Sequence, residues 1–224
     1  MKKVLITILS VLSIFNICLS VYLITKLNSE EYKIDYYKEN LYSVVEIKAE
    51  STFGITSYGT ACCYKDSYFI TNAHIVNLDN NGENIYTDFS YRYADEDEYT
   101  KFELINVNVE FDLAIFKVND NKHKPVMIGS NKVNVGDEVY SLGNVSNQGL
   151  TLSKGIVSLN KVLVNNKEYI CSDNLISSGN SGGGLFNVNN ELVGITSFTL
   201  ESNPYAYSIP IESIDAFYEE TINN

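Results

Sequence analysis

The segment 178–186 (SGNSGGGLF) places Ser181 among four glycines. Glycine tolerates positive φ and lets the backbone approach a ligand closely, so such a segment can present N–H groups to a reacting atom. A serine hydroxyl is a poor nucleophile alone, and acyl-transfer chemistry would need a neighbouring base. Without such a base, the same residues predict only a glycine-rich turn between two strands.

Two histidines are available as that base. His123 lies in a polar, proline-ended stretch between two lysines, which disfavours an added proton and is typical of solvated surface. His74 lies near the end of an apolar stretch, 69–76 (FITNAHIV), where a histidine is by default a satisfied member of the core. If Ser181 is a nucleophile, however, His74 is its only reasonable base.

A third residue should be a carboxylate that fixes the tautomer of the base and stabilises its charged form. Asp112 stands at the start of an apolar strand, 110–118 (EFDLAIFKV), where burial without a partner would be costly. A histidine partner explains that position, although Glu110 is a local alternative and a turn at the strand start would need no partner. The order His74, Asp112, Ser181 in an all-β chain is hard to obtain by accident.

The chain that must position these residues consists of short β-type runs separated by turn signals. Only 211–220 has a helical period, and pairs such as Asn81-Gly82 and Asn165-Asn166 mark turns between runs. About a dozen strands with hardly a helix predict a β-barrel or a sandwich. The runs cover residues 41–49, 59–64, 68–71, 84–91, 100–109, 113–118, 138–142, 150–157, 161–164, 168–171, 184–188, 191–198 and 206–209.

An apolar segment precedes these runs. Residues 4–24 carry no charge, and 21 residues are enough to cross a bilayer core as a helix. No convincing small-x-small cleavage site follows, and the flanking charges favour a cytoplasmic N-terminus. We therefore predict an uncleaved signal anchor over 1–27, a polar tether over 28–40 and a domain over 41–224 outside the cytoplasm. The alternative is a cleaved signal peptide and a secreted domain.

Composition limits the partners and the covalent chemistry. A chain of 224 residues has room for one ordinary domain, and its formal net charge of −12 argues against nucleic acid or anionic lipid as the main partner. The acidic run 95–98 is typical of a solvated loop. Besides Cys18 in the apolar segment the cysteines are Cys62, Cys63 and Cys171, and no CxxC pattern suggests zinc or a redox couple. We predict buried free thiols, with a pairing of Cys171 as the alternative.

In their order along the chain, these segments resemble chymotrypsin-fold serine proteases, most closely those of the HtrA (Deg) type. The resemblance runs from residue 41 to residue 214 and includes the string around Ser181. It implies an all-β fold of two six-stranded antiparallel β-barrels with a short C-terminal helix. The matching blocks are 71–76 (TNAHIV), 112–115 (DLAI), 136–137 (GD), 142–144 (LGN), 155–158 (GIVS), 179–183 (GNSGG), 192–195 (LVGI) and 208–211 (SIPI).

The same resemblance implies acyl transfer without a cofactor or a metal. His74 would take the proton of Ser181 while Asp112 orients the imidazole, and the backbone N–H groups of Gly179 and Ser181 would bind the oxyanion. Substrates would be extracytoplasmic, unfolded or misfolded polypeptides, and trimers are common in the family. A catalytically silent or latent protease-like module that binds peptides at the membrane is the alternative, although all three residues of the triad are present.

The resemblance also implies a primary specificity pocket. Its expected walls are Leu175 and Ile176, before the nucleophile, and the strand Ile195, Thr196 and Ser197. Leu175 stands where a trypsin-like enzyme would have an aspartate, so a small or aliphatic residue is expected before the scissile bond. An extended substrate would pair with the edge of this strand.

Two residues depart from the family pattern. Gly184 and Val145 stand where the family usually has proline, which affects loop stiffness more than chemistry. The chain also ends at Asn224, so we expect no C-terminal peptide-binding PDZ domain and no regulation through one.

Overall fold

The computed structural model describes residues 2–77, 85–129, 132–145, 148–201 and 203–223. The predicted turn at Asn81-Gly82 lies outside these residues. The chain divides into two compact units, Met1–Glu39 and Asn40–Asn224. Each unit is described here by itself.

The first unit is one helix, α1 (Lys2–Glu39). Its window Leu9–Lys26 has a mean hydropathy of 1.7 and is long and apolar enough to span a membrane. A signal sequence near an N-terminus meets the same criterion. The helix continues through the residues expected to form the tether and ends where the second unit begins.

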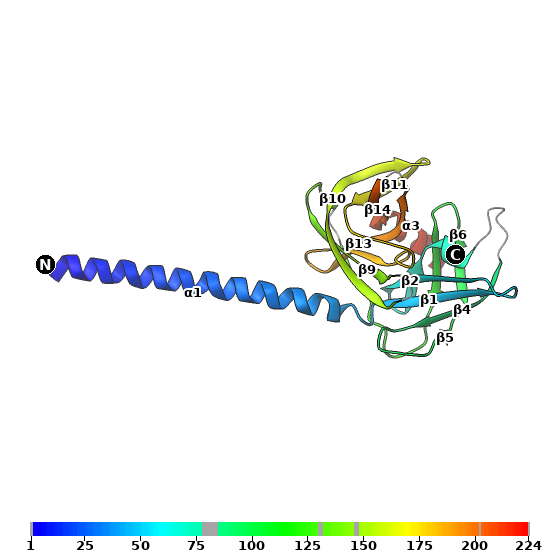
Figure 1. Cartoon of the computed structure of the whole chain (residues 1–224), viewed down its shortest axis with the longest axis horizontal. Coiled ribbons are helices and arrows are strands. Elements are labelled where there is room, and N and C mark those ends of the chain that lie inside the picture. The colour runs from blue at the N-terminus through cyan, green and yellow to red at the C-terminus, as the bar shows by residue number, and fades with distance from the viewer. Residues whose placement is uncertain (1, 78–84, 130–131, 146–147, 202, 224) are drawn as a thin grey trace. The chain divides into compact units, whose positions relative to one another are not determined.

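The second unit starts with a seven-stranded antiparallel sheet (Figure 1). Its strands pair in the order β5-β4-β1-β2-β3-β7-β6, and apolar residues on them face a common core. Phe102 and Phe116 stack in that core with ring centroids 3.8 Å apart. The one-turn helix α2 (Ala73–Val76) follows β3. The strands are β1 (Val44–Ser51), β2 (Thr56–Lys65), β3 (Tyr68–Thr71), β4 (Tyr86–Arg92), β5 (Thr100–Lys101), β6 (Leu104–Asn108) and β7 (Leu113–Lys117).

A second seven-stranded sheet follows in the chain. Six of its strands close into a barrel, because β12 pairs with both β9 and β13, while the short β8 adds to β13 in parallel. A cluster of buried aliphatic residues, including Val139, Ile170 and Leu185, fills its interior. The strands are β8 (Met127–Ile128), β9 (Glu138–Asn144), β10 (Leu150–Val164), β11 (Lys167–Ser172), β12 (Gly184–Asn187), β13 (Glu191–Leu200) and β14 (Asn203–Pro210).

The helix α3 (Ile211–Ile222) follows the second sheet in the chain and contacts strands of both sheets, β13 and β14 of the second and β7 of the first. The ring of Tyr218 lies 5.3 Å from that of Tyr64, centroid to centroid. Asp215 accepts hydrogen bonds from the Tyr64 hydroxyl at 2.6 Å and from Lys65 Nζ at 2.8 Å. Helix α3 therefore connects the two sheets.

The predicted all-β class with a C-terminal helix is confirmed. Of the two predicted six-stranded barrels, the second sheet contains a closed one, whereas the first sheet is a seven-stranded half-barrel whose end strands β5 and β6 do not pair with each other among the described residues. The remaining differences are local. The runs expected at 150–157 and 161–164 form one strand, β10, because two register shifts against β11 absorb the irregularity between them. The run expected at 100–109 is divided into β5 and β6. Asn165 and Asn166, with φ of +50° and +64°, form the predicted turn between β10 and β11.

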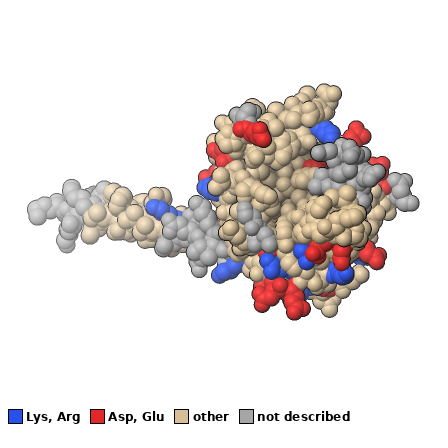
Figure 2. Space-filling view, turned by 45° about the vertical axis from the view of Figure 1, so that its right-hand side comes forward, with Lys and Arg blue, Asp and Glu red and all other residues tan. Residues whose placement is uncertain are grey.

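Two predictions about the surface and the thiols also hold. Cys62, Cys63 and Cys171 are buried and all four cysteines are free, so Cys171 is not paired. The acidic run 95–98 is largely exposed, and Asp95 accepts a hydrogen bond from the Tyr42 hydroxyl at 3.0 Å. Acidic side chains lie at several places around the second unit in the view of Figure 2, with the densest group along its lower edge, in keeping with the strongly negative net charge.

Candidate active site

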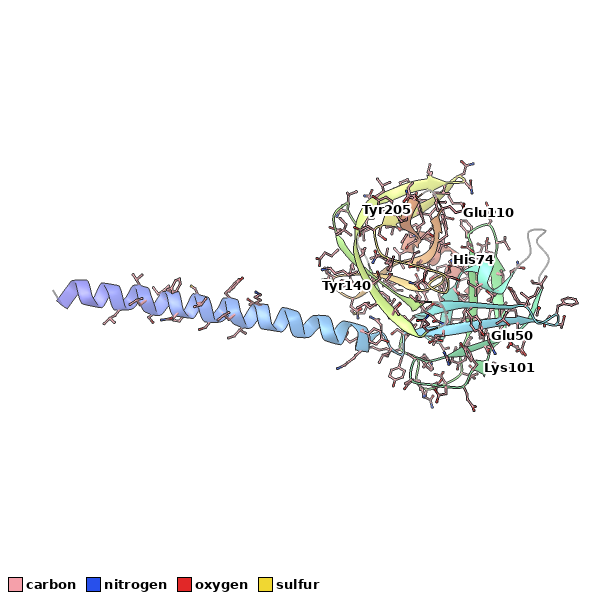
Figure 3. All side chains as sticks on the ribbon, in the orientation of Figure 1. Glu50, His74, Lys101, Glu110, Tyr140 and Tyr205 are labelled. Carbon is pink, nitrogen blue, oxygen red and sulfur yellow. The ribbon has the colours of Figure 1, made fainter. Side chains whose placement is uncertain are left out.

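His74 belongs to the short helix α2, directly after β3 (Figure 3). Its Nδ1 lies 2.9 Å from Oδ1 and 3.0 Å from Oδ2 of Asp112. The backbone N–H of His74 also donates to Asp112 Oδ1 at 3.0 Å, because the first turn of a helix leaves its N–H groups without partners inside the helix. One carboxylate therefore holds both the ring and the backbone of His74.

Asp112 precedes β7 with a φ of +55°, in the left-handed region that aspartate tolerates better than most residues. Its carbonyl accepts a hydrogen bond from Asn72 Nδ2 at 3.0 Å, which anchors this unusual backbone to the residue before α2. Ser197 Oγ, from β13 of the second sheet, donates to Asp112 Oδ2 at 2.6 Å. Glu110, the local alternative, is exposed. The acid beside His74 is thus Asp112.

These contacts determine the charge of Asp112. Burial alone would raise the pKa of its carboxyl, but the hydrogen bonds and the charge of His74, together with the Ser197 hydroxyl, outweigh burial and lower it. An ionised carboxylate can only accept a hydrogen bond, so the Nδ1 of a neutral imidazole beside it carries the ring proton and donates. The lone pair of a neutral His74 therefore lies on Nε2, where it can accept a proton from a hydroxyl group.

Ser181 is half-buried, and its Oγ donates to the carbonyl oxygen of Ser197 at 2.7 Å. Within the residues that the structure describes, no hydrogen bond joins Ser181 to His74. Ser197 nevertheless brings the two groups together, because its hydroxyl contacts Asp112 while its carbonyl contacts Ser181. The predicted nucleophile and the predicted histidine–aspartate pair thus lie on either side of one residue.

The loop around Ser181 leaves two N–H groups without partners. In the described part of the chain, the N–H groups of Asn180, Gly182 and Gly183 donate to backbone carbonyls, whereas those of Gly179 and Ser181 donate to none. Gly179 has a φ of +97°, which a residue with a side chain rarely adopts. Unpaired backbone N–H groups in a mostly buried loop are rare, and two of them flanking a nucleophile suit an anionic oxygen.

The glycines after Ser181 are required by close contacts with both sheets. A Cβ on Gly182, whose φ is +85°, would lie 1.9 Å from the carbonyl oxygen of Thr60. A Cβ on Gly183 would lie 2.4 Å from the carbonyl oxygen of Leu142. The loop is therefore seated against β2 of the first sheet and β9 of the second.

Gly184, where the resembled family usually has proline, is the first residue of β12 and not part of the loop. It pairs with Leu142 on one side and with Ile195 on the other. A Cβ at this position would lie 2.4 Å from the ring of Phe186, so that ring occupies the space a larger residue would need.

The predicted pocket residues have different surroundings. Leu175 is 81% exposed, Ile176 is half-buried, and Ile195 and Thr196 are buried. Thr196 Oγ1 is buried without a hydrogen-bond partner among the described residues. Ser197, expected only as a pocket wall, instead contacts both Asp112 and Ser181. The described residues contain no group of three or more side chains that could hold a metal ion.

Sequence reasoning missed Thr60 and misjudged His123. Thr60 Oγ1 donates to the Gly179 carbonyl at 2.8 Å from a position 119 residues earlier, and no local pattern signals that contact. His123, expected as solvated surface, is only partly exposed, with 22% of its side chain accessible and Nδ1 3.3 Å from Asp120 Oδ1. The spacing Asp120-x-x-His123 was the available signal for this second pair.

The family model of the trypsin-like peptidase domain matches residues 59–195, a stretch that includes His74, Asp112 and Ser181. A probable periplasmic serine endoprotease DegP-like of Buchnera aphidicola subsp. Baizongia pistaciae is 32% identical over 163 residues, which are 67% of this chain and 33% of that protein. A protein of the same description from Pseudomonas putida is 34% identical over 156 residues, or 66% and 31% of the two chains. The chain spans about a third of the length of these curated relatives.

Solved structures share the fold. The Rv3671c protease from M. tuberculosis in its active form superposes with a TM-score of 0.74 at 16% identity, covering 84% of this chain and 83% of that one. The serine endoprotease from Yersinia pestis gives a TM-score of 0.71 at 24% identity, covering 84% and 67%.

Proposed function

Since the chain belongs to the family of trypsin-like peptidase domains, we propose that it is a serine endopeptidase in which Ser181, His74 and Asp112 perform acyl transfer. The observation that carries the proposal is the position of Ser197 between the two parts of the site. Its hydroxyl donates to the carboxylate that holds His74, and its carbonyl accepts the hydroxyl of Ser181. A structural role alone would not require a nucleophile, a base and an acid to converge from both sheets.

In the proposed reaction, the Ser181 hydroxyl leaves the Ser197 carbonyl by rotation about Cα–Cβ and passes its proton to His74 Nε2. Ser181 Oγ attacks the peptide carbonyl, and Asp112 stabilises the imidazolium that forms. The tetrahedral oxyanion accepts hydrogen bonds from the unpaired N–H groups of Gly179 and Ser181, each worth about 3–4 kcal/mol. His74 then protonates the leaving amine, and water hydrolyses the acyl-enzyme.

The cellular setting is part of the same proposal. The periplasmic description of the relatives and the apolar window Leu9–Lys26 support an extracytoplasmic enzyme that this helix holds at the membrane. Unfolded or misfolded polypeptides are the proposed substrates, with a small or aliphatic residue before the scissile bond. The resemblance also supports a homo-oligomer, with a trimer as the expected form.

A fluorophosphonate probe tests the nucleophile directly. In the full chain, Ser181→Ala should abolish both labelling and cleavage of an unfolded protein while leaving the melting temperature unchanged. Ser178→Ala is the matched control, because Ser178 is exposed in the same loop and should be dispensable. Labelling of Ser181→Ala, or no labelling of folded wild-type protein, would contradict the proposal.

One observation favours a second candidate, a latent module that binds peptides without turnover. The Ser181 hydroxyl donates to Ser197 and not to His74, so the described conformation still requires a rearrangement before proton transfer. A peptide that binds the wild-type protein but is not cleaved, even after prolonged incubation with unfolded protein as activator, would favour this candidate.

A further inference from the structure

We propose that Thr60 is a positioning residue for the oxyanion site: it holds the loop 177–182 in the conformation that leaves the N–H groups of Gly179 and Ser181 unpaired. This inference rests on the proposed peptidase function. Thr60 lies on β2 of the first sheet and is fully buried, and among the described residues its side chain forms hydrogen bonds with Gly179 and Asn144 and with no member of the triad.

Thr60 binds the loop at two successive places. Its Oγ1 donates to the carbonyl of Gly179 at 2.8 Å, and its backbone N–H donates to the carbonyl of Ser181 at 2.9 Å. The carbonyl of Asn180, between them, accepts the N–H of Gly183 at 2.9 Å. Three consecutive peptide units are therefore fixed by their carbonyl oxygens. Because a trans peptide bond sets its N–H opposite its C=O, the direction of the Ser181 N–H is fixed too.

The hydroxyl proton of Thr60 has one available direction. A hydroxyl has a single O–H donor, and Thr60 Oγ1 accepts the backbone N–H of Asn144 at 2.8 Å. An amide N–H cannot accept, so the Thr60 proton is directed to the Gly179 carbonyl. The N–H of the same Gly179–Asn180 peptide unit donates to the Ser177 carbonyl at 3.1 Å, which holds this unit at both ends.

The ion pair between Glu46 and Arg92 is connected to Thr60 through Asn144. Asn144 Nδ2 donates to Glu46 Oε2 at 3.1 Å, and that oxygen also accepts Arg92 Nε at 3.0 Å and Nη2 at 2.8 Å. The Glu46 side chain is only 2% exposed, so each donor compensates a buried charge. The hydrogen bonds run from Arg92 through Glu46 and Asn144 to Thr60, and they cross from the first sheet to the second and back.

Loss of the Thr60 hydroxyl should impair the transition state more than substrate binding. Without it, the Gly179 carbonyl and the Asn144 N–H are buried without partners, and the loop relaxes toward pairing its own N–H groups. The oxyanion forms only along the reaction path, so kcat should fall while KM stays nearly constant. We expect a decrease of roughly 10- to 100-fold, less than the about 10²–10³ that loss of one oxyanion donor costs.

The test compares Thr60→Val, which keeps the shape and removes the hydroxyl, with Thr60→Ser, which keeps the hydroxyl. Active sites are titrated with the fluorophosphonate, so that kcat is calculated per reactive site and misfolded protein is excluded from the enzyme concentration. Thr60→Val should lower kcat per titrated site, leave KM within about two-fold, and weaken a peptide boronate by the same factor as kcat. Thr60→Ser should stay within about three-fold of wild type in all three quantities.

A role of Thr60 in stability alone would lower the melting temperature and the number of titrated sites but not kcat per site, and that result would overturn the proposal. Equal losses in Thr60→Ser and Thr60→Val would also overturn it. If Thr60→Val does not fold, Thr60→Cys replaces it, because a thiol matches the serine side chain closely in size but is a weak donor. Equal kcat in Thr60→Cys and Thr60→Ser would then count against Thr60. Retained turnover in Ser181→Ala would contradict the peptidase function itself, so failure of that proposal is distinguishable from failure of the Thr60 proposal.

Discussion

Each of the two histidines in this chain lies against an aspartate, and the two pairs are built differently. His74 and Asp112 are 38 residues apart, and their side chains approach to 2.9 Å between α2 and the start of β7. His123 and Asp120 are three residues apart in one loop, with 3.3 Å between Nδ1 and Oδ1. The first pair joins separate elements, whereas the second belongs to a single turn of chain.

The two pairs also differ in the other hydrogen-bond partners of their aspartates. Asp112 accepts the hydroxyl of Ser197, which belongs to the second sheet and also contacts Ser181. Asp120, in the loop after β7, accepts the hydroxyls of Tyr91 and Tyr93 at 2.8 and 3.0 Å, and these residues lie in and directly after β4 of the same sheet. Both aspartates have a lowered pKa, so charge does not distinguish them. A histidine–aspartate pair becomes a candidate for chemistry only when its third partner leads to a nucleophile.

The largest expected difference lies between the two histidines themselves. His74→Ala should lower kcat by about 10⁶-fold, because it removes the base while leaving the oxyanion site in place. His123→Ala should change kcat by less than about three-fold. Cleavage of a peptide substrate, normalised to correctly folded protein, measures both. A comparable loss in the two variants would remove the distinction between the pairs.

Substitution of the two aspartates should give almost as large a difference in kcat. Asp112→Asn should lower kcat by about 10⁴-fold, because an amide can donate to Nδ1 and then favours the wrong tautomer of His74. In Asp120→Asn, kcat should stay near the wild-type value. The same peptide assay applies, with melting temperatures to show that both variants are folded. A nearly active Asp112→Asn would mean that the His74 tautomer does not depend on this carboxylate.

Ser197→Ala should have a moderate effect. The variant removes the hydroxyl that donates to Asp112 but keeps the carbonyl that accepts Ser181 Oγ. A hydrogen bond to a charged group contributes about 1.5–3 kcal/mol, and His74 still holds the carboxylate, so kcat should fall about ten-fold. Thr199→Ala, exposed on the same strand, is the control. Wild-type kcat in Ser197→Ala would show that its side chain does not position Asp112.

The smallest effect concerns Asp120 and acid stability. Burial would raise the pKa of its carboxyl, but hydrogen bonds from Tyr91, from two backbone N–H groups and from Tyr93 outweigh burial and lower it. A carboxyl with a lowered folded-state pKa adds stability above its unfolded pKa of about 3.9, and this stability is lost as pH falls through the folded pKa. Asp120→Asn should therefore lower the free energy of unfolding by about 1 kcal/mol near pH 7.

Urea unfolding of wild-type and Asp120→Asn protein measures this difference as a function of pH. The two curves should converge as pH falls below about 4, where the wild-type carboxyl takes up its proton. A gap of equal size at neutral and acid pH would mean that packing, and not the charge of Asp120, is responsible.

The sequence predicted those parts of the fold and site that depend on local patterns. Alternating apolar residues located most strands, and the Asn165-Asn166 pair marked a turn because asparagine tolerates the positive φ that such a turn requires. The approach of His74 and Asp112 was also predictable, since a carboxylate at the mouth of an apolar strand needs a partner.

Contacts between distant segments could not be predicted in the same way. Thr60 is an ordinary strand residue in the sequence, and its function depends on where a loop 119 residues later comes to lie. Ser197 was placed near the substrate, but its two contacts depend on the side-chain and backbone geometry at the junction of the sheets. The Asp120–His123 pair was visible in the spacing and was missed because its lysine neighbours suggested solvent.

The contact of α3 with the first sheet forms late in biosynthesis, because α3 is the last element of the chain. A chain leaves the ribosome from its N-terminus, so β1–β7 are complete before α3 is made. The surface around Tyr64 and Lys65 stays uncovered until then. The nascent sheet that carries His74 and Asp112 also has neither Ser181 nor Ser197 beside it. Under the proposed mechanism, a chain that ends after β7 therefore lacks its nucleophile and cannot cleave itself or the proteins that handle it.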